Sequence, residues 1–135
     1  RDFSFGWQMR TWVRMQTRTG KAKAFLYYFD RVPPGPDSSR YGAYHASEIA
    51  YVFGNLLPPR PWEDTDRKLS EAVSSYWVNF ATTGDPNGKG LTKWPAYRES
   101  SDVAEELGDK IGPLPDLHKA ALDFLDVYFA AQRNH

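Results

Sequence analysis

Apolar side chains recur along this chain with different spacings, and each spacing predicts a different element. Residues 24–29 form an uninterrupted apolar and aromatic run between Gly20 and the proline-rich stretch 33–36. A short run of this kind is typical of a strand that is buried on both faces. Residues 3–17 are predicted to form a helix, with Asp2 as its N-cap and Gly20 as its C-terminal stop.

This first helix carries two distinct faces. Trp12, Met15 and Phe5 share an apolar face. A row of arginines at four-residue spacing occupies another face: Arg10, Arg14 and Arg18. We interpret that row as a solvated helix face rather than as an anion site.

Two helices are predicted in the middle of the chain. A short helix over residues 46–53 ends at Gly54. A longer helix is capped by Asp64 or Asp66 and ends in the turn-rich stretch 83–88. Its apolar residues fall at i, i+3 and i+4 spacing: Leu69, Val73, Tyr76, Trp77 and Phe80.

The last third of the chain predicts a loop, a strand and a helix. Residues 94–97 anchor the loop, and a short strand is expected near residues 103–107. The final amphipathic helix is marked by five residues: Leu117, Ala121, Phe124, Leu125 and Tyr128.

The number of strands is too small for a complete sheet. A strand as apolar as residues 24–29 needs neighbours on each side, and the chain offers at most one more. Either the domain is mostly helical with an isolated strand, or the rest of the sheet lies on other polypeptide. We favour the second alternative, which makes the fold class α/β with a sheet that is incomplete as a stand-alone unit.

Composition narrows the possible functions. The 135 residues suffice for one domain with a sizeable core. Residues 1–60 carry nine Lys and Arg against four Asp and Glu, whereas residues 61–135 carry eight against thirteen. These opposite excesses of five charges suit pairing within the fold better than binding of nucleic acid.

Cysteine is absent, which excludes disulfides and thiol catalysis, and no apolar run approaches the length of a membrane span. The compartment stays open.

His45 is the strongest candidate for a catalytic residue. It follows the loop 30–44, which itself follows the predicted strand, and open α/β sheets bind ligands beyond the carboxyl ends of their strands. Imidazole takes and returns protons near neutral pH, so a histidine in this place is suited to acid–base catalysis. Gly42 supplies backbone freedom that can aim the loop. Without further information, a surface or capping histidine is the simpler interpretation.

Other candidate sites are weaker. His118 is expected on a helix surface and His135 in a frayed tail, and this spacing of histidines makes a metal site improbable. Residues 84–90 are glycine-rich but lack the Lys-Ser/Thr pair of a phosphate-binding loop. We therefore expect no cofactor and no metal. Asp37 is a possible acid partner only because it precedes His45 on the same loop.

Several segments together resemble the C-terminal portion of type-B carboxylesterases, the cholinesterase-like branch of the α/β-hydrolases. Residues 26–30 (LYYFD) are similar to the last large strand of that family, and residues 42–49 (GAYHASEI) with 51–54 (YVFG) are similar to its histidine loop. Residues 76–88 and 94–97 resemble the closing signature of the family. The order of the segments is the order in the family. The lack of cysteine is more similar to bacterial members than to animal ones.

The resemblance implies hydrolysis of carboxylic esters through an acyl-enzyme, with His45 in a triad of serine, acid and histidine. In α/β-hydrolases the chain order is serine, acid, histidine, and these 135 residues contain no G-x-S-x-G elbow. Residues 1–135 are therefore expected to be the C-terminal segment of a single α/β-hydrolase domain, built from the last strands and their flanking helices. Its partner would be the N-terminal portion, which carries the nucleophile and the oxyanion hole.

Neighbours of His45 have several interpretations. Glu48 is either the third-position carboxylate of the short helix, or the triad acid itself, or a supporting carboxylate behind the histidine, as the resemblance implies. Tyr44 either lines a substrate pocket or packs in the core. A non-catalytic relative that serves protein–protein recognition, and a self-contained helical binding module, are the alternatives to an esterase.

Overall fold

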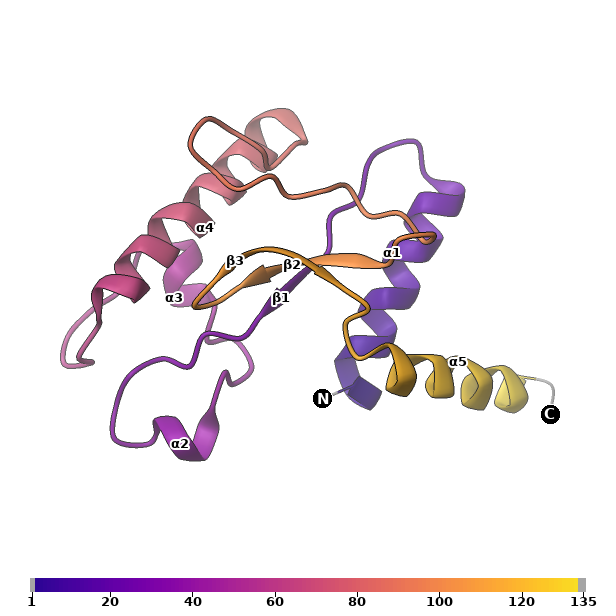
Figure 1. The fold of residues 1–135 in the computed structure, drawn as a ribbon, viewed down its shortest axis with the longest axis horizontal. Coiled ribbons are helices and arrows are strands. Elements are labelled where there is room, and N and C mark those ends of the chain that lie inside the picture. Colours follow the sequence, from indigo (N-terminus) through magenta and orange to yellow (C-terminus); the bar gives the residue numbers. More distant parts are fainter. Residues whose placement is uncertain (1, 134–135) are drawn as a thin grey trace. The chain divides into compact units, whose positions relative to one another are not determined.

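The computed structural model describes residues 2–133 and divides into two compact units. The first unit combines the segment up to residue 26 with residues 95–104 and the segment from residue 114 onward, and the second comprises residues 27–94 and 105–113. In chain order the elements in Figure 1 are η1 (Asp2–Gly6, a π-helical turn), α1 (Trp7–Thr19), β1 (Tyr27–Phe29), α2 (Ser38–Tyr41), α3 (Ile49–Val52), α4 (Asp64–Thr83), β2 (Val103–Leu107), β3 (Ile111–Pro115) and α5 (Lys119–Arg133).

The predicted helices are confirmed, with differences at their ends. The first helix begins as η1 and continues as α1 up to Gly20, whose N–H donates to the carbonyl of Gln16 at 2.8 Å. The short helix is confined to α3, because a turn occupies the residues before it. α4 begins one residue after Glu63, and Gly84 ends it in the left-handed conformation (φ 77°) that glycine adopts without steric cost.

The sheet has three strands in the order β1-β2-β3 within the described residues. β1 pairs in parallel with β2, and Tyr27 lies opposite Glu105 (Figure 1). β2 confirms the strand predicted at residues 103–107, whereas β3 was not predicted. Glycine and proline dominate its sequence IGPLP, and neither residue favours a strand interior.

β1 differs from the prediction in both length and burial. It spans three residues rather than six, and Tyr27 keeps 36% of its surface exposed while Phe29 is buried. The expectation of a strand covered on both faces is therefore wrong for the described chain. The apolar run alone could not reveal this, because burial depends on neighbours and not on the strand's own composition.

Arg10 and Arg14 of the arginine row on α1 face inward, whereas Arg18 is exposed, so the prediction of a solvated face is correct only for Arg18. Arg10 is 4% exposed, whereas Trp12 is 70% and Met15 is 56% exposed. Arginine carries a long aliphatic stem and can be buried when acidic groups surround its guanidinium. Those acidic groups come from residues 95–104 and from α5. Arginines from the basic first half of the chain thus pair with aspartates from the acidic second half.

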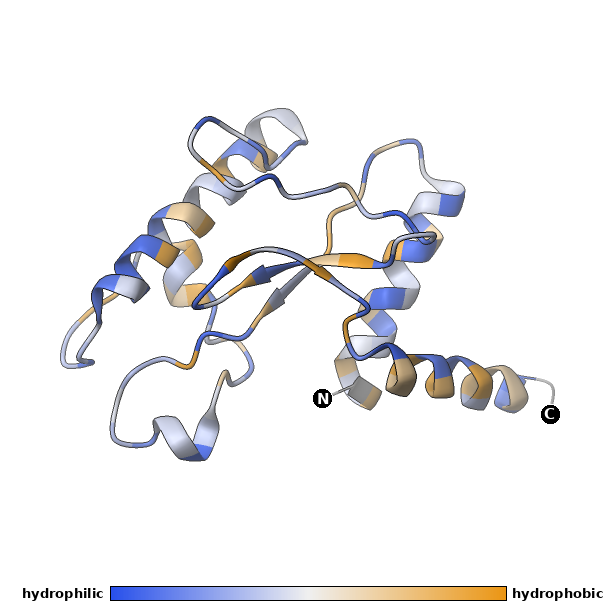
Figure 2. Cartoon of the chain, in the orientation of Figure 1, coloured by the Kyte–Doolittle hydropathy of each residue, from blue (hydrophilic) through white to orange (hydrophobic). Residues whose placement is uncertain are grey.

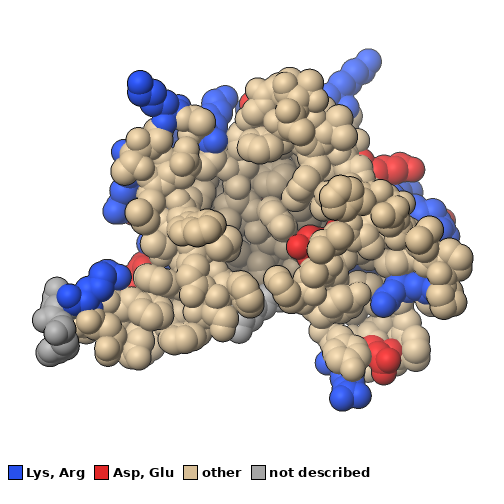
Figure 3. All heavy atoms as spheres, turned by 180° about the vertical axis from the view of Figure 1, so that it is seen from behind, with Lys and Arg blue, Asp and Glu red and all other residues tan. Residues whose placement is uncertain are grey.

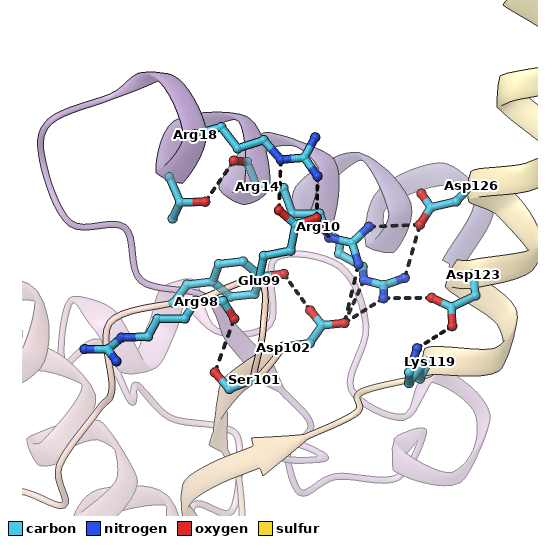
Figure 4. Close-up of polar contacts among 12 residues, drawn as sticks. Arg10, Arg14, Arg18, Arg98, Glu99, Ser101, Asp102, Lys119, Asp123 and Asp126 are labelled. Atoms are coloured by element: carbon cyan, nitrogen blue, oxygen red, sulfur yellow. Dashed lines mark hydrogen bonds and ion pairs between the residues drawn. The ribbon is translucent and has the colours of Figure 1, made fainter.

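We call this set of side chains the Arg10 cluster (Figure 4): Arg10, Arg14, Asp102, Asp123 and Asp126. Arg10 donates from Nε to Asp102 at 2.9 Å and from Nη2 to Asp123 at 2.8 Å, and Arg14 donates to Asp126 at 2.9 Å. Burial alone would lower the pKa of Arg10, but the hydrogen bonds to Asp102 and Asp123 raise it overall. The cluster therefore stays charged and joins α1 to α5 and to the loop before β2.

The apolar core of the first unit is small. α5 packs against α1 and η1, and it buries Leu122 and Leu125. Figure 2 shows apolar and polar residues alternating along this helix. The predicted apolar face is only partly correct, since Phe124 is 68% exposed.

The second unit has the larger core. α4 buries Leu69, Val73 and Tyr76, and the Tyr76 ring meets Trp94 edge-on with the ring centroids 5.3 Å apart. Trp94 is 5% exposed, which confirms that this residue anchors its loop. No helix within residues 2–133 is long and apolar enough to cross a membrane.

Glu105 is a buried carboxyl in the middle strand of the sheet. It is 0% exposed, and neither of its oxygens has a hydrogen-bond partner among the described residues. Burial raises the pKa of Glu105 to about 7. An unpaired charge in this place is costly, so the carboxyl is held in its neutral form up to neutral pH.

We expect Glu105→Met to stabilise the protein at pH 8 and to have little effect at pH 5. The folded-state pKa of about 7 lies above the ordinary value of 4.5, so the cost of ionising Glu105 grows between these pH values and is complete above pH 7. The size of the cost is on the order of 3 kcal/mol. Thermal unfolding at both pH values measures it. Glu71→Gln on the exposed side of α4 is the control, and equal shifts in the two variants would contradict this account.

We expect Arg10→Leu to lower the free energy of unfolding by about 3–5 kcal/mol, because it leaves Asp102 without its buried partner. Arg18→Leu is the matched control on the same helix, since the Arg18 side chain is 63% exposed and pairs with Glu99 at the surface. Its effect should be much smaller. Denaturant titration compares the two variants. An equal loss in the free energy of unfolding would show that the Arg10 cluster stabilises the protein no more than a surface ion pair does.

Candidate functional site

His45 lies in a tight turn between α2 and α3. The N–H of Ser47 donates to the carbonyl of Tyr44 at 3.1 Å, which places His45 and Ala46 at the centre of the turn. Ala46 has φ 69°, a conformation that L-residues other than glycine, asparagine and aspartate rarely adopt. His45 is exposed. Strained backbone of this kind persists only where the surroundings enforce it, and it is frequent at functional sites.

Gly42 adopts a backbone conformation that few other residues can adopt. Its dihedral angles are φ 57° and ψ −147°, and this combination is accessible almost only to glycine. The N–H of Gly42 also closes α2 by donating to the carbonyl of Ser38 at 2.9 Å. The predicted need for backbone freedom at Gly42 is therefore confirmed.

Glu48 directly precedes α3 and makes no capping hydrogen bond through its side chain. It is the N-cap residue and not the third helical residue, so the first of its three interpretations is wrong. Glu48 is half-buried. Burial raises the pKa of Tyr27 in β1, and the charge of Glu48 raises it further, which indicates that the carboxylate lies near the sheet.

Tyr44 lines a cavity of about 680 Å³. The walls are formed by residues 33–38, by Tyr41, Gly42 and Tyr44, and by Leu57 and residues 59–61. His45 is not among the lining residues, so the cavity opens on the side of the loop that precedes the histidine. Arg60 donates to the carbonyl of Pro34 at 3.1 Å and holds its two loops together. Asp37 also lies on the wall and is exposed.

The remaining histidine candidates belong to other parts of the chain. His118 is in the turn before α5, and not on a helix surface, and it belongs to the other unit. His135 lies outside the described residues. Within residues 2–133 no group of histidine and acidic side chains is arranged to hold a metal ion.

A set of ion-paired and hydrogen-bonded side chains around the buried Asp66 was missed by the sequence analysis. We call it the Asp66 cluster: Arg31, Tyr51, Glu63, Asp66 and Asp109. Asp66 is 0% exposed and accepts hydrogen bonds from both Arg31 and Tyr51. The sequence showed Asp66 only as a possible helix cap. The N-cap residue is Glu63, so the prediction of Asp64 or Asp66 in that position is wrong. Asp66 is the third-position partner of a capping box, in which its carboxylate accepts from the N–H of Glu63 at 2.8 Å.

We expect Gly42→Ala to lower the free energy of unfolding by about 1–2 kcal/mol, because alanine is strained at positive φ. No atom lies within 4 Å of a Cβ built at Gly42, so the cost would come from the backbone alone. Gly112→Ala is the control, since its Cβ also meets open space and its φ is not positive. Denaturant titration should show a loss only at Gly42. Equal results at both positions would mean that the loop does not adopt this conformation.

Comparisons with known proteins assign the chain to a family. Residues 1–114 match the Carboxylesterase family. Carboxylesterase 5A of Canis lupus familiaris is 37% identical over 108 residues, which cover 70% of this chain and 19% of that protein. Para-nitrobenzyl esterase of Bacillus subtilis (strain 168) is 35% identical over 85 residues, which cover 59% of this chain and 17% of that protein.

A solved structure of PNB esterase superposes with a TM-score of 0.66 at 30% sequence identity, covering 78% of this chain and 22% of the esterase. The chain thus spans about a fifth of the length of the carboxylesterases that it matches. It is a mixed α/β segment that corresponds to part of an α/β-hydrolase structure. The segment, with its small three-stranded sheet, belongs to the carboxylesterase family.

Proposed function

We propose that this chain is the C-terminal portion of an α/β-hydrolase carboxylesterase and that His45 is the histidine of its catalytic triad. The observation that supports this proposal most is the exposed turn that holds His45 between α2 and α3, in a chain that belongs to the carboxylesterase family. The chain order of α/β-hydrolases supports this proposal, because the histidine follows the serine and the acid. The absence of cysteine leads us to group the chain with bacterial carboxylesterases.

In the proposed reaction the substrate is a small carboxylic ester. A serine hydroxyl attacks the acyl carbon while the His45 imidazole takes the hydroxyl proton. The tetrahedral intermediate expels the alcohol, which receives that proton from His45, and an acyl-enzyme remains. Water then attacks the acyl carbon with His45 again as the base, and the carboxylic acid and the free serine are released.

The nucleophile, the triad acid and the oxyanion hole would come from the N-terminal portion of the same enzyme. The described chain exposes large apolar side chains that such a partner would cover, among them Trp12, Phe53 and Val127 at 70–71% exposure. On the face drawn in Figure 3, uncharged residues cover most of the surface and charged residues are scattered. β1 is an outer strand of the described sheet, and a strand of the N-terminal portion would pair along its other edge.

Two neighbours of His45 receive supporting roles. We assign Glu48 as a carboxylate behind the histidine, since it is half-buried beside the turn and near β1. We assign Tyr44 to the wall of a substrate pocket, since it lines the cavity next to the turn. The cavity is bounded mostly by proline, tyrosine and leucine side chains, which suits an apolar acyl or alcohol group.

A second candidate is a non-catalytic segment for protein–protein recognition on the same fold. The exposed apolar side chains favour it, because such surfaces mark interaction sites. It requires no chemistry from His45.

We expect His45→Gln in the full-length enzyme to reduce kcat for a p-nitrophenyl ester by about 10⁴-fold or more, because the serine loses its general base. His118→Gln is the control, since His118 belongs to the other unit, and it should leave kcat unchanged. Release of p-nitrophenol measures both rates. The 135-residue chain alone should be inactive, since it lacks an elbow serine.

Labelling with a fluorophosphonate distinguishes the two candidates. An esterase carries the label on a serine of the N-terminal portion, and His45→Gln slows the labelling. A protein that is never labelled supports the recognition candidate. If His45→Gln were to keep full activity, the role of His45 would be refuted.

A further inference from the structure

Both ends of the loop that carries His45 are fastened to a single buried carboxylate. Arg31 begins the loop two residues after β1, and Tyr51 lies in α3 six residues after His45. Arg31 Nε donates to Asp66 Oδ1 at 2.7 Å, and the Tyr51 hydroxyl donates to the same oxygen at 2.7 Å. We propose that Asp66 is a positioning residue that sets the place of His45 through Arg31 and Tyr51. This inference rests on the proposed function of His45.

The carboxylate of Asp66 uses both of its oxygens. Oδ2 accepts from Arg31 Nη2 at 3.1 Å and from the N–H of Glu63 at 2.8 Å, in addition to the two bonds on Oδ1. Four hydrogen bonds to one carboxylate restrict it to a single orientation. Arg31 is restricted as well, because its other groups donate to Glu63 and Asp109 at 2.7 Å. Neither end of the loop can shift without breaking charge-assisted bonds.

Asp66 remains ionised in the folded protein. Burial alone would raise its pKa, but the hydrogen bonds from Arg31 and Tyr51 outweigh burial and lower it. The stabilisation from an acid with a lowered pKa is present above its unfolded value and is lost only as the pH falls through the folded value. The hydrogen bonds from Arg31 and Tyr51 to the Asp66 carboxylate are therefore present at neutral pH. Burial and the bond to Asp66 also raise the pKa of Tyr51, which keeps its hydroxyl protonated as a donor.

α3 is attached to α4 by a second set of bonds. The hydroxyls of Ser70 and Ser74 donate to the carbonyl of Tyr51 at 2.9 and 3.0 Å, and Ser74 also donates to the carbonyl of Val52 at 2.9 Å. These bonds fix the backbone of α3, whereas the Tyr51–Asp66 bond connects it to the start of the loop. A general base must be held within a fraction of an ångström of its working position. The two attachments together provide that restraint.

Tyr51→Phe tests the inference, with Tyr76→Phe as its matched control. Both tyrosines are fully buried, and each loses one hydroxyl bond, at 2.7 Å to Asp66 and at 2.6 Å to the carbonyl of Thr92. In the full-length enzyme we expect Tyr51→Phe to lower kcat about tenfold with KM within about twofold, because His45 is displaced and substrate binding is not. Tyr76→Phe should lower the melting temperature similarly and leave kcat unchanged.

Arg31→Lys provides an independent variant at the other end of the loop. Lysine keeps the positive charge beside Asp66, Glu63 and Asp109 but loses the forked pair of bonds to Asp66. It should show the same selective loss of kcat, which keeps the inference testable if Tyr51→Phe does not fold. The inference is overturned if the folded variants at Tyr51 and Arg31 match Tyr76→Phe in kcat.

The result for His45→Gln separates this inference from the proposed function. If His45→Gln is inactive while the Tyr51 and Arg31 variants keep wild-type kcat, His45 is catalytic and Asp66 does not position it. If His45→Gln is active, the proposed function fails, and the positioning role fails with it.

Discussion

A guanidinium or a carboxylate that leaves water loses hydration that only close, well-oriented partners can replace. Both units of this chain depend on that constraint. In the first, Arg10 is buried against Asp102 and Asp123, and in the second, Arg31 is held by Asp66. Because these ions come from distant parts of the sequence, their pairing fixes which segments meet. The apolar cores pack around these ion pairs.

Much of the local structure could be predicted from the sequence. The period of α4 and its glycine stop are visible in the chain. A strand at residues 103–107 was predicted as well, although its sequence VAEEL does not alternate apolar and polar residues. β3 could not be predicted, because its glycine and prolines form a strand only where neighbouring residues supply the pairing. The inward orientation of α1 was hidden for a related reason. An arginine row has the same sequence whether water or aspartates face it, and only the fold distinguishes the two.

The candidate site, like the fold, could be predicted from the sequence only in part. His45, Gly42 and Tyr44 stand in one short stretch whose residue types suggest a functional loop, and the structure places them in consecutive turns. The residues that restrain this stretch are spread over β1's end, α3 and α4, and no spacing rule connects them. Asp66 resembled an ordinary helix cap because capping is the one of its roles that involves near neighbours in sequence.

The ion pairs of α5 bear on where this domain ends. Similarity to the carboxylesterase family stops at residue 114, before the helix begins at Lys119. Nevertheless Asp123 and Asp126 complete the surroundings of Arg10 and Arg14, and Trp7 Nε1 donates to Asp126 at 2.7 Å. A domain boundary drawn at residue 114 would separate α1 from Asp123 and Asp126 and leave it with only Asp102 and Glu99 as acidic partners among the described residues. The last helix therefore belongs to the same compact unit as α1, although the family match ends before it.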